Sequence, residues 1–422
     1  MDKIKKLTLS NGLKIILAPE RDGLATTIAI LVRAGSKYET KEINGISHFL
    51  EHMCFKGTEK RKRAMDIASE LDGIGAKYNA FTAQEYTSYY AKVKKEFLGK
   101  AFDVVSDLYL NPVFDEQEIE KEKGVIIEEI NMYEDLPSRR VQEFFMELVY
   151  GEQPAGWSIA GRKEVIQRIK KEDFLKYRGA HYLPQATVIV VSGGFQEKVI
   201  LGEIKKVFGQ LKTSRKDEKP KVKEGQKTPA ELIRHKESDQ THLVLGFRAF
   251  DVFDERRYAL HVLADILGGG MSSRLFQKIR EEMGAAYYVN ASADLYSDHG
   301  LLMMSAGIQH AKIEQVIKAA LVEFAAFKNK LISPGELKRA KDHITGNFFL
   351  SLETSDEIGY FYGGQEILGT KLISPDQFAR KIKAVTTEDV KKTAAAIVKN
   401  SGLNLAVLGP FKGRSFSNIL KV

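Results

Sequence analysis

The sequence predicts an α+β fold made of two homologous domains in tandem, each with a mixed, mainly antiparallel sheet packed with helices. Strand patterns and helical patterns follow one another in both halves of the chain. The second half also repeats the first: residues 171–195 align without a gap with residues 387–411, at a constant offset of 216 (387 minus 171). Two copies of one domain are therefore favoured over two unrelated domains. A chain of 422 residues is also too long for a single ordinary core.

The elements of the first half are predicted from apolar periodicity and turn signals. The chain begins with an expected hairpin over residues 7–18, with Asn11-Gly12 as its turn. The other expected elements of this half are a strand at 26–35, a helix from the N-cap Asn44 to Gly57, a helix at 63–73, a strand pair within 75–93, helices at 96–110 and 115–134, further helical stretches to about 181, and a strand at 187–194.

A polar stretch separates the two halves. Residues 212–229 consist almost entirely of Lys, Asp, Glu, Ser, Thr and Pro and lack apolar periodicity, which is typical of a linker. We therefore predict an N-terminal domain at 1–212, a linker at 213–229 and a C-terminal domain at 230–422. Strands are expected near 232–233 and 242–247, and a long helical region from about Arg256.

The expected helix at 44–57 contains the pattern His-x-x-Glu-His. At 100° per residue, Glu51 and His52 each lie within about 60° of His48 on one helix face, opposite an apolar face. Two His at i and i+4 can hold one divalent metal, and a Glu one turn away can reach a water molecule on that metal. The alternative is a helix with two hydrogen-bonded His and a surface Glu. In the second half, the aligned positions are Leu260, Leu263 and Ala264, so we predict a metal site only in the first copy.

A catalytic zinc site needs a third protein ligand besides the two His. Cys54 is expected to point away from the His pair and to serve as a small apolar core residue. The helix at 115–134 has a predicted apolar stripe of Ile119, Val125, Ile126, Ile130 and Tyr133, and Glu122 and Glu129 fall within it. Carboxylates on an apolar face are costly unless they are paired or bound to a cation, so either Glu122 or Glu129 is a candidate ligand.

The motif helix together with the segment from Glu122 to Glu129 resembles the pitrilysin family of inverzincin zinc peptidases, which includes insulin-degrading enzyme and the mitochondrial processing peptidases. The resemblance covers nearly the whole chain, including the degenerate second copy. It implies one Zn²⁺ per chain, held by His48, His52 and Glu129, with Glu122 supporting the site from behind the ligands. It also implies that Glu51 is the general base of a metalloendopeptidase.

Two further segments resemble functional elements of that family. Asn79, Ala80 and Phe81 match the edge strand on which an extended peptide substrate adds to the sheet. Arg280 and Tyr287 match an Arg/Tyr pair that holds the substrate carbonyl oxygen, although Ala285 stands where relatives more often carry Leu. At this length the resemblance implies a homodimer whose active sites are shared between subunits. A non-catalytic scaffold or a subunit of a larger complex, as in members that lost the chemistry, is the alternative.

Composition bounds the remaining possibilities. The net charge is +8, with basic residues spread along the chain, and the run Lys60–Arg63 lacks interleaved aromatics, so we expect a solvated loop and no nucleic-acid partner. We expect no membrane span and no export signal. A single cysteine fits a reducing, cytoplasmic location.

Overall fold

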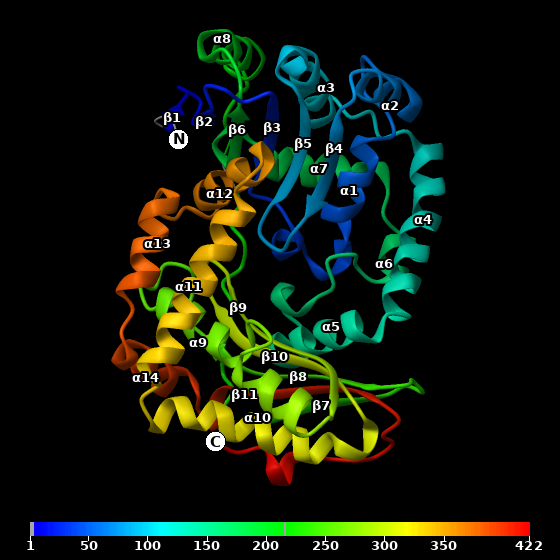
Figure 1. Cartoon of the computed structure of the whole chain (residues 1–422). Coiled ribbons are helices and arrows are strands. Elements are labelled where there is room, and N and C mark those ends of the chain that lie inside the picture. The colour runs from blue at the N-terminus through cyan, green and yellow to red at the C-terminus, as the bar shows by residue number, and fades with distance from the viewer. Residues whose placement is uncertain (1–3, 215–216) are drawn as a thin grey trace. The chain divides into compact units, whose positions relative to one another are not determined.

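The computed structural model describes residues 4–214 and 217–422 (Figure 1). The chain forms two compact units, and each is assembled from three segments. The first unit comprises Met1–Ile130, Ser158–Pro220 and Leu350–Leu372, and the second comprises Asn131–Trp157, Lys221–Phe349 and Ile373–Val422. The predicted linker includes residues 215–216, which lie outside the described residues; its other residues carry no helix or strand up to Pro229.

The first unit is built on a six-stranded sheet in the order β1-β2-β6-β3-β5-β4. Its strands are β1 (Lys5–Thr8), β2 (Lys14–Pro19), β3 (Ala25–Val32), β4 (Lys77–Thr82), β5 (Thr87–Lys94) and β6 (Thr187–Gly193). All neighbouring pairs are antiparallel except β2 and β6, which are parallel. The helices are α1 (Ile46–Cys54), α2 (Ala64–Asp72), α3 (Leu98–Leu110), α4 (Glu116–Glu134), α6 (Lys163–Ile166), α7 (Lys171–His181), α8 (Glu197–Phe208) and α12 (Ser355–Leu368), with the end of α4 passing into the second unit.

The second unit repeats this sheet with five strands in the order β7-β11-β8-β10-β9. Its strands are β7 (Ala230–His235), β8 (Thr241–Ala249), β9 (Ala286–Leu295), β10 (Gly300–Ile308) and β11 (Leu403–Gly409). Its helices are α5 (Pro137–Tyr150), α9 (Arg257–Gly268), α10 (Ile313–Asn329), α11 (Pro334–Ser351), α13 (Pro375–Ala384) and α14 (Thr387–Ile397). The one parallel pair, β7 with β11, corresponds to β2 with β6. The predicted duplication is therefore visible strand by strand.

Two helices exchange units: α5, from the first half of the sequence, lies in the second unit, and α12, from the second half, lies in the first. Helix α5 presents Val141 and Phe145 to the buried strands β8 and β11 of the second unit. Helix α12, orange in Figure 1, packs on β3 and β6 of the first unit. This close packing depends on glycine, because a Cβ at Gly359 would lie 2.7 Å from the Ser192 hydroxyl. The two units therefore do not follow a single cut of the chain, because α5 buries its apolar face in the second unit and α12 packs on the sheet of the first.

Three local expectations differ from the structure. The hairpin loop spans the residues between Thr8 and Lys14, so it is longer than a two-residue turn, although Gly12 has the positive φ (83°) of a turn. Val125 is 51% exposed and does not belong to the apolar face of α4. Arg61 is buried rather than solvated, since its guanidinium binds Glu70, Asp103 and Asp107.

Candidate functional site

The N-terminus of α1 is capped differently from the sequence prediction. The helix begins at Ile46, and its N-cap is Gly45 with φ of 98° rather than Asn44. The buried carboxylate of Glu39 accepts hydrogen bonds from the backbone N–H groups of Gly45 (2.7 Å) and Ser47 (2.8 Å) and from the side-chain amide of Asn44 (2.9 Å). Glu39 therefore satisfies the N–H groups that open this helix and are left without partners inside it.

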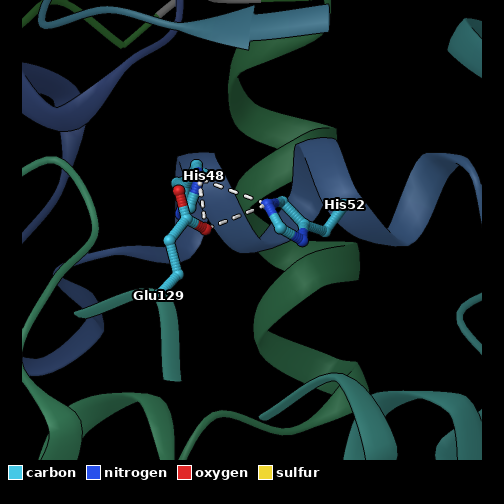
Figure 2. A group of neighbouring side chains, drawn as sticks. All are labelled: His48, His52 and Glu129. Atoms are coloured by element: carbon cyan, nitrogen blue, oxygen red, sulfur yellow. Dashed lines mark hydrogen bonds and ion pairs between the residues drawn. The ribbon is translucent and has the colours of Figure 1, made fainter. Parts of the chain in front are cut away.

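His48, His52 and Glu129 converge on one point, as Figure 2 shows. The Nε2 atoms of the two imidazoles lie 3.2 Å apart. One carboxylate oxygen of Glu129, on α4, lies 3.6 Å from each of them. These three side chains are the one group of potential metal ligands found among residues 4–214 and 217–422.

This geometry fits a divalent metal. With metal–nitrogen distances of about 2.0–2.1 Å, two nitrogens of a tetrahedral site lie roughly 3.3–3.4 Å apart. A separation of 3.6 Å between the Glu129 oxygen and each imidazole is too long for a hydrogen bond but short enough for an ion pair if the ring is protonated, so the carboxylate faces both rings at once. Two nitrogens and one oxygen also form the ligand set that zinc takes in catalytic sites.

Glu122 lies behind His52 and fixes its tautomer. One oxygen of the Glu122 carboxylate is 2.8 Å from Nδ1 of His52, and the other is 2.5 Å from the Lys56 ammonium. If His52 Nδ1–H donates to Glu122, its Nε2 lone pair is left pointing toward His48 and Glu129. Burial disfavours the charged form of Glu122, but the hydrogen bonds from His52 and Lys56 outweigh burial and lower its pKa. Helix periodicity alone leaves Glu122 and Glu129 as alternative ligands. In the structure, Glu129 faces both imidazoles, whereas Glu122 contacts Nδ1 of His52.

Glu51 lies on the same face of α1 and is buried. Its carboxylate accepts a hydrogen bond of 2.5 Å from the Thr82 hydroxyl, at the end of β4. Burial raises the pKa of Glu51, while the hydrogen bond from Thr82 and the charge of His52 act in the opposite direction. A carboxylate with a raised pKa beside a metal site has the properties of a general base.

Asn79, Ala80 and Phe81 lie on an open sheet edge. Strand β4 pairs with β5 on one side and is the last strand of its sheet. Ala80 is buried toward α1, whereas the Asn79 side chain is exposed and Phe81 contacts the ring of Tyr360 on α12. The unpaired side of β4 can accept another strand.

Arg280 and Tyr287 belong to the second unit, whereas the His48, His52 and Glu129 group belongs to the first. Arg280 is exposed on a π-helical segment, Phe276–Glu282. Tyr287 is 73% exposed and is the extra residue of a β-bulge, because Gly307 pairs with Tyr288 and Ile308 pairs with Ala286. Bulges and π-helical turns are both frequent at functional sites, where they redirect side chains.

Three contacts of the site were not predicted from the sequence: those made by Glu39, Lys56 and Thr82. Lys56 follows His52 by one helical turn, so an i+4 reading of the motif helix would have placed it on the same side. Thr82 directly follows the predicted edge-strand residues. Glu39 lies six residues before Gly45, in the segment that leads into α1, and no sequence pattern marks it as a capping residue. The Cys54 prediction is confirmed: the thiol is buried against Tyr89, and burial raises its pKa to about 12.

A His-x-x-Glu-His helix joined to a carboxylate on a second helix, on a duplicated α+β fold, defines the inverzincin class of metallopeptidases. The chain belongs to the insulinase family (peptidase family M16), which matches residues 15–163, while the inactive domain of peptidase M16 matches residues 168–344. This confirms the resemblance inferred from the sequence.

The relatives cover nearly the whole chain. This chain is 37% identical over 410 residues to YmxG of Bacillus subtilis, which is named an uncharacterized zinc protease, and the match covers 96% of this chain and 98% of the relative. It is 36% identical over 415 residues to a zinc protease of Rickettsia felis, covering 97% and 98%.

Solved structures confirm the predicted fold of two tandem α+β domains. A protease from Helicobacter pylori is 22% identical, with a TM-score of 0.89, and the match covers 97% of this chain and 99% of that one. A structure from Pseudomonas fluorescens titled as a peptidase M16 inactive domain is 18% identical with the same TM-score, covering 98% and 100%. Within the described part of this chain, no helix is long and apolar enough to cross a membrane.

Proposed function

We propose that the chain is a zinc-dependent endopeptidase that hydrolyses peptides or short unfolded segments. The observation that carries this proposal is the convergence of His48, His52 and Glu129 beside the buried carboxylate of Glu51. The relatives are named uncharacterized zinc proteases, which supports zinc as the metal. The single group of potential ligands among the described residues supports one ion per chain.

The chemistry divides between the metal and the side chains. Bound zinc supplies a Lewis acid that brings the pKa of water toward neutrality and polarises the peptide carbonyl. Glu51 takes the proton of the attacking water and returns it to the leaving amine. Glu122 holds His52 in the tautomer that exposes its Nε2 lone pair. Arg280 and Tyr287 hold the negative charge that develops on the carbonyl oxygen.

The substrate is proposed to bind as an extended strand along Asn79, Ala80 and Phe81. The open edge of β4 supports this mode, because main-chain hydrogen bonds give affinity without requiring a particular sequence. Most strands of a folded protein are already paired on both sides and fixed in place, so we expect cleavage of a reduced, unfolded protein and resistance of the same protein when folded. Equal cleavage of both forms would contradict edge-strand binding.

The decisive experiment is incubation with a mixed peptide library, with products read by mass spectrometry. Zinc-loaded protein should cleave, a chelator should stop cleavage, and added zinc should restore it. The Glu51→Gln variant should retain zinc and lose activity by about 10²–10⁴-fold, the usual contribution of a general base. Full activity in that variant would contradict the mechanism, and zinc-loaded protein without any cleavage would favour the scaffold alternative. Glu128→Gln, on the exposed side of α4, is the matched control.

We further propose a cytoplasmic homodimer in which zinc and the Arg280/Tyr287 pair of one active site come from different subunits. The chain carries both elements, so one kind of subunit suffices for two complete sites. Mixing the Glu51→Gln and Arg280→Ala proteins should raise activity well above that of either variant alone, because every mixed dimer then contains one intact site. Mixtures that stay inactive after confirmed subunit exchange would contradict the shared site.

A further inference from the structure

Thr82 connects the edge strand β4 to the carboxylate of Glu51. It is the last residue of the edge strand β4, and its side chain points toward α1. Its hydroxyl lies 2.5 Å from Oε2 of Glu51 and 3.5 Å from both the Ser47 carbonyl oxygen and the Thr87 hydroxyl. Glu51 is therefore by far its nearest polar partner.

The direction of this hydrogen bond follows from the groups involved. A threonine hydroxyl carries one proton, and an ionised carboxylate only accepts. The single proton of Thr82 is therefore directed to Oε2 of Glu51, and a charged acceptor makes this bond stronger than one between neutral groups. Helix α1 determines where the backbone of Glu51 lies, but it leaves the terminal carboxylate torsion broad. The bond to Thr82 fixes that torsion and leaves Oε1 to exchange a proton.

We propose that Thr82 is a positioning residue for the general base Glu51, so that the strand which receives the substrate also orients the carboxylate that acts on it. This inference rests on the proposed function. Strand β4 is held by β5 on one side only. A peptide that pairs with its open edge therefore adds a second set of backbone hydrogen bonds to β4 and holds Thr82 against Glu51 more firmly.

The test compares substitutions of Thr82 that keep or remove the hydroxyl. Thr82→Val preserves shape and removes the donor, whereas Thr82→Ser keeps the donor. Thr27→Val is the matched control: it removes a buried hydroxyl from β3 that contacts Ser355, away from Glu51. For each zinc-loaded variant, kcat, KM, zinc content and thermal unfolding are measured on one peptide identified with the wild type. Thr82→Ala replaces the valine variant if the latter does not fold.

We expect Thr82→Val to lower kcat by about 10–100-fold, the range for losing a hydrogen bond to a charged group, with KM within about 2-fold and zinc content unchanged. Thr82→Ser should recover kcat to within about 3-fold of the wild type, and Thr27→Val should change unfolding alone. Unchanged kcat in Thr82→Val, a loss confined to KM, a loss of zinc, or no recovery with serine would each overturn the proposal. If the wild type is inactive, or Glu51→Gln is active, the proposed function fails instead.

Discussion

Helices α1 and α9 occupy equivalent places in the two halves, each following the strand that lies third from the end of its sheet, β3 or β8. In α1 the residues of the His-x-x-Glu-His motif are His48, Glu51 and His52. In α9 the aligned positions are Leu260, Leu263 and Ala264, all buried in the apolar core of the second unit. The same fold therefore forms with and without the polar group. Burying the polar residues of α1 costs free energy that the apolar residues of α9 do not cost. Since the fold does not require these polar residues, their presence indicates a function.

The edge strands differ in a complementary way. Strand β4 pairs with β5 in regular register to its end at Thr82, where its side chain meets Glu51. Strand β9, its equivalent, carries a bulge that leaves Tyr287 exposed. The half that holds the group of potential metal ligands thus has the regular edge strand, and the other half has the edge strand with the redirected Tyr287 side chain. The two copies diverged into parts that the proposed reaction needs together.

The largest expected effect comes from giving α1 the residues of α9. The triple substitution His48→Leu, Glu51→Leu and His52→Ala should abolish zinc binding and all measurable hydrolysis, because two ligands and the base are removed. Zinc content and peptide cleavage measure this directly. Far-ultraviolet circular dichroism should retain the wild-type shape, since the second half folds with these residues. Zinc still bound at one ion per chain would show that the metal lies elsewhere.

The next effect concerns the half without the metal group. Arg280→Ala should lower kcat by about 10²–10³-fold without changing zinc content, since one donor to a developing oxyanion contributes on that scale. Gln277→Ala, on the same π-helical segment, is the control and should keep wild-type kcat. Steady-state kinetics and metal analysis provide the measurements. Wild-type kcat in the Arg280 variant would leave the second half with no demonstrated part in the reaction.

A smaller effect, on zinc affinity, should distinguish Glu122 from Glu129, the two carboxylates of α4 that lie at the imidazoles. Glu129→Gln removes a ligand, whereas Glu122→Gln weakens the support of His52 and should reduce zinc affinity by about 10–100-fold. Competition with a chelator of known affinity measures both variants. Equal affinities in the two variants would contradict the separate roles that the geometry assigns to Glu122 and Glu129.

Much of this arrangement was predictable from the sequence because it depends on local periodicity. The face shared by His48, Glu51 and His52 follows from helix geometry alone, and the 216-residue repeat (387 minus 171) predicted the second sheet. The exchanged packing of α5 and α12 was not predictable, because an apolar helix face does not specify which sheet will cover it. Val125 was misplaced for a related reason, since periodicity does not show how wide a buried stripe is. The N-terminal cap of α1 was not predicted, because Asn44 is itself a common N-cap residue. The buried carboxylate that accepts hydrogen bonds from the first N–H groups of the helix belongs instead to Glu39.

The N-termini of α1 and α9 provide the last test, which has the smallest expected effect, because their nearby carboxylates differ. The N-terminus of α1 rests on Glu39, for which burial raises the pKa from 4.5 to about 7 against the opposing effect of its hydrogen bonds. Near the start of α9, Asp254 accepts hydrogen bonds from Arg256, and the bond from the Arg256 side chain lowers the pKa of Asp254. The two carboxylates should therefore make the free energy of unfolding depend on pH in different ranges.

The sign follows from proton uptake. Because the folded chain holds the Glu39 proton more tightly than the unfolded chain, the contribution of Glu39 to stability is fully present below pH 4.5 and is lost as the pH rises through about 7. A shift of this size corresponds to about 3 kcal/mol. The stability difference between wild type and Glu39→Gln, measured by urea unfolding of metal-free protein at several pH values, should accordingly move in favour of the wild type as the pH falls from 8 to 5. Asp254→Asn should give a difference that is flat over the same range, because Asp254 stays ionised in both states. A flat difference for Glu39→Gln as well would mean that the cap of α1 is charged throughout and that its burial is fully compensated by the three hydrogen bonds it accepts.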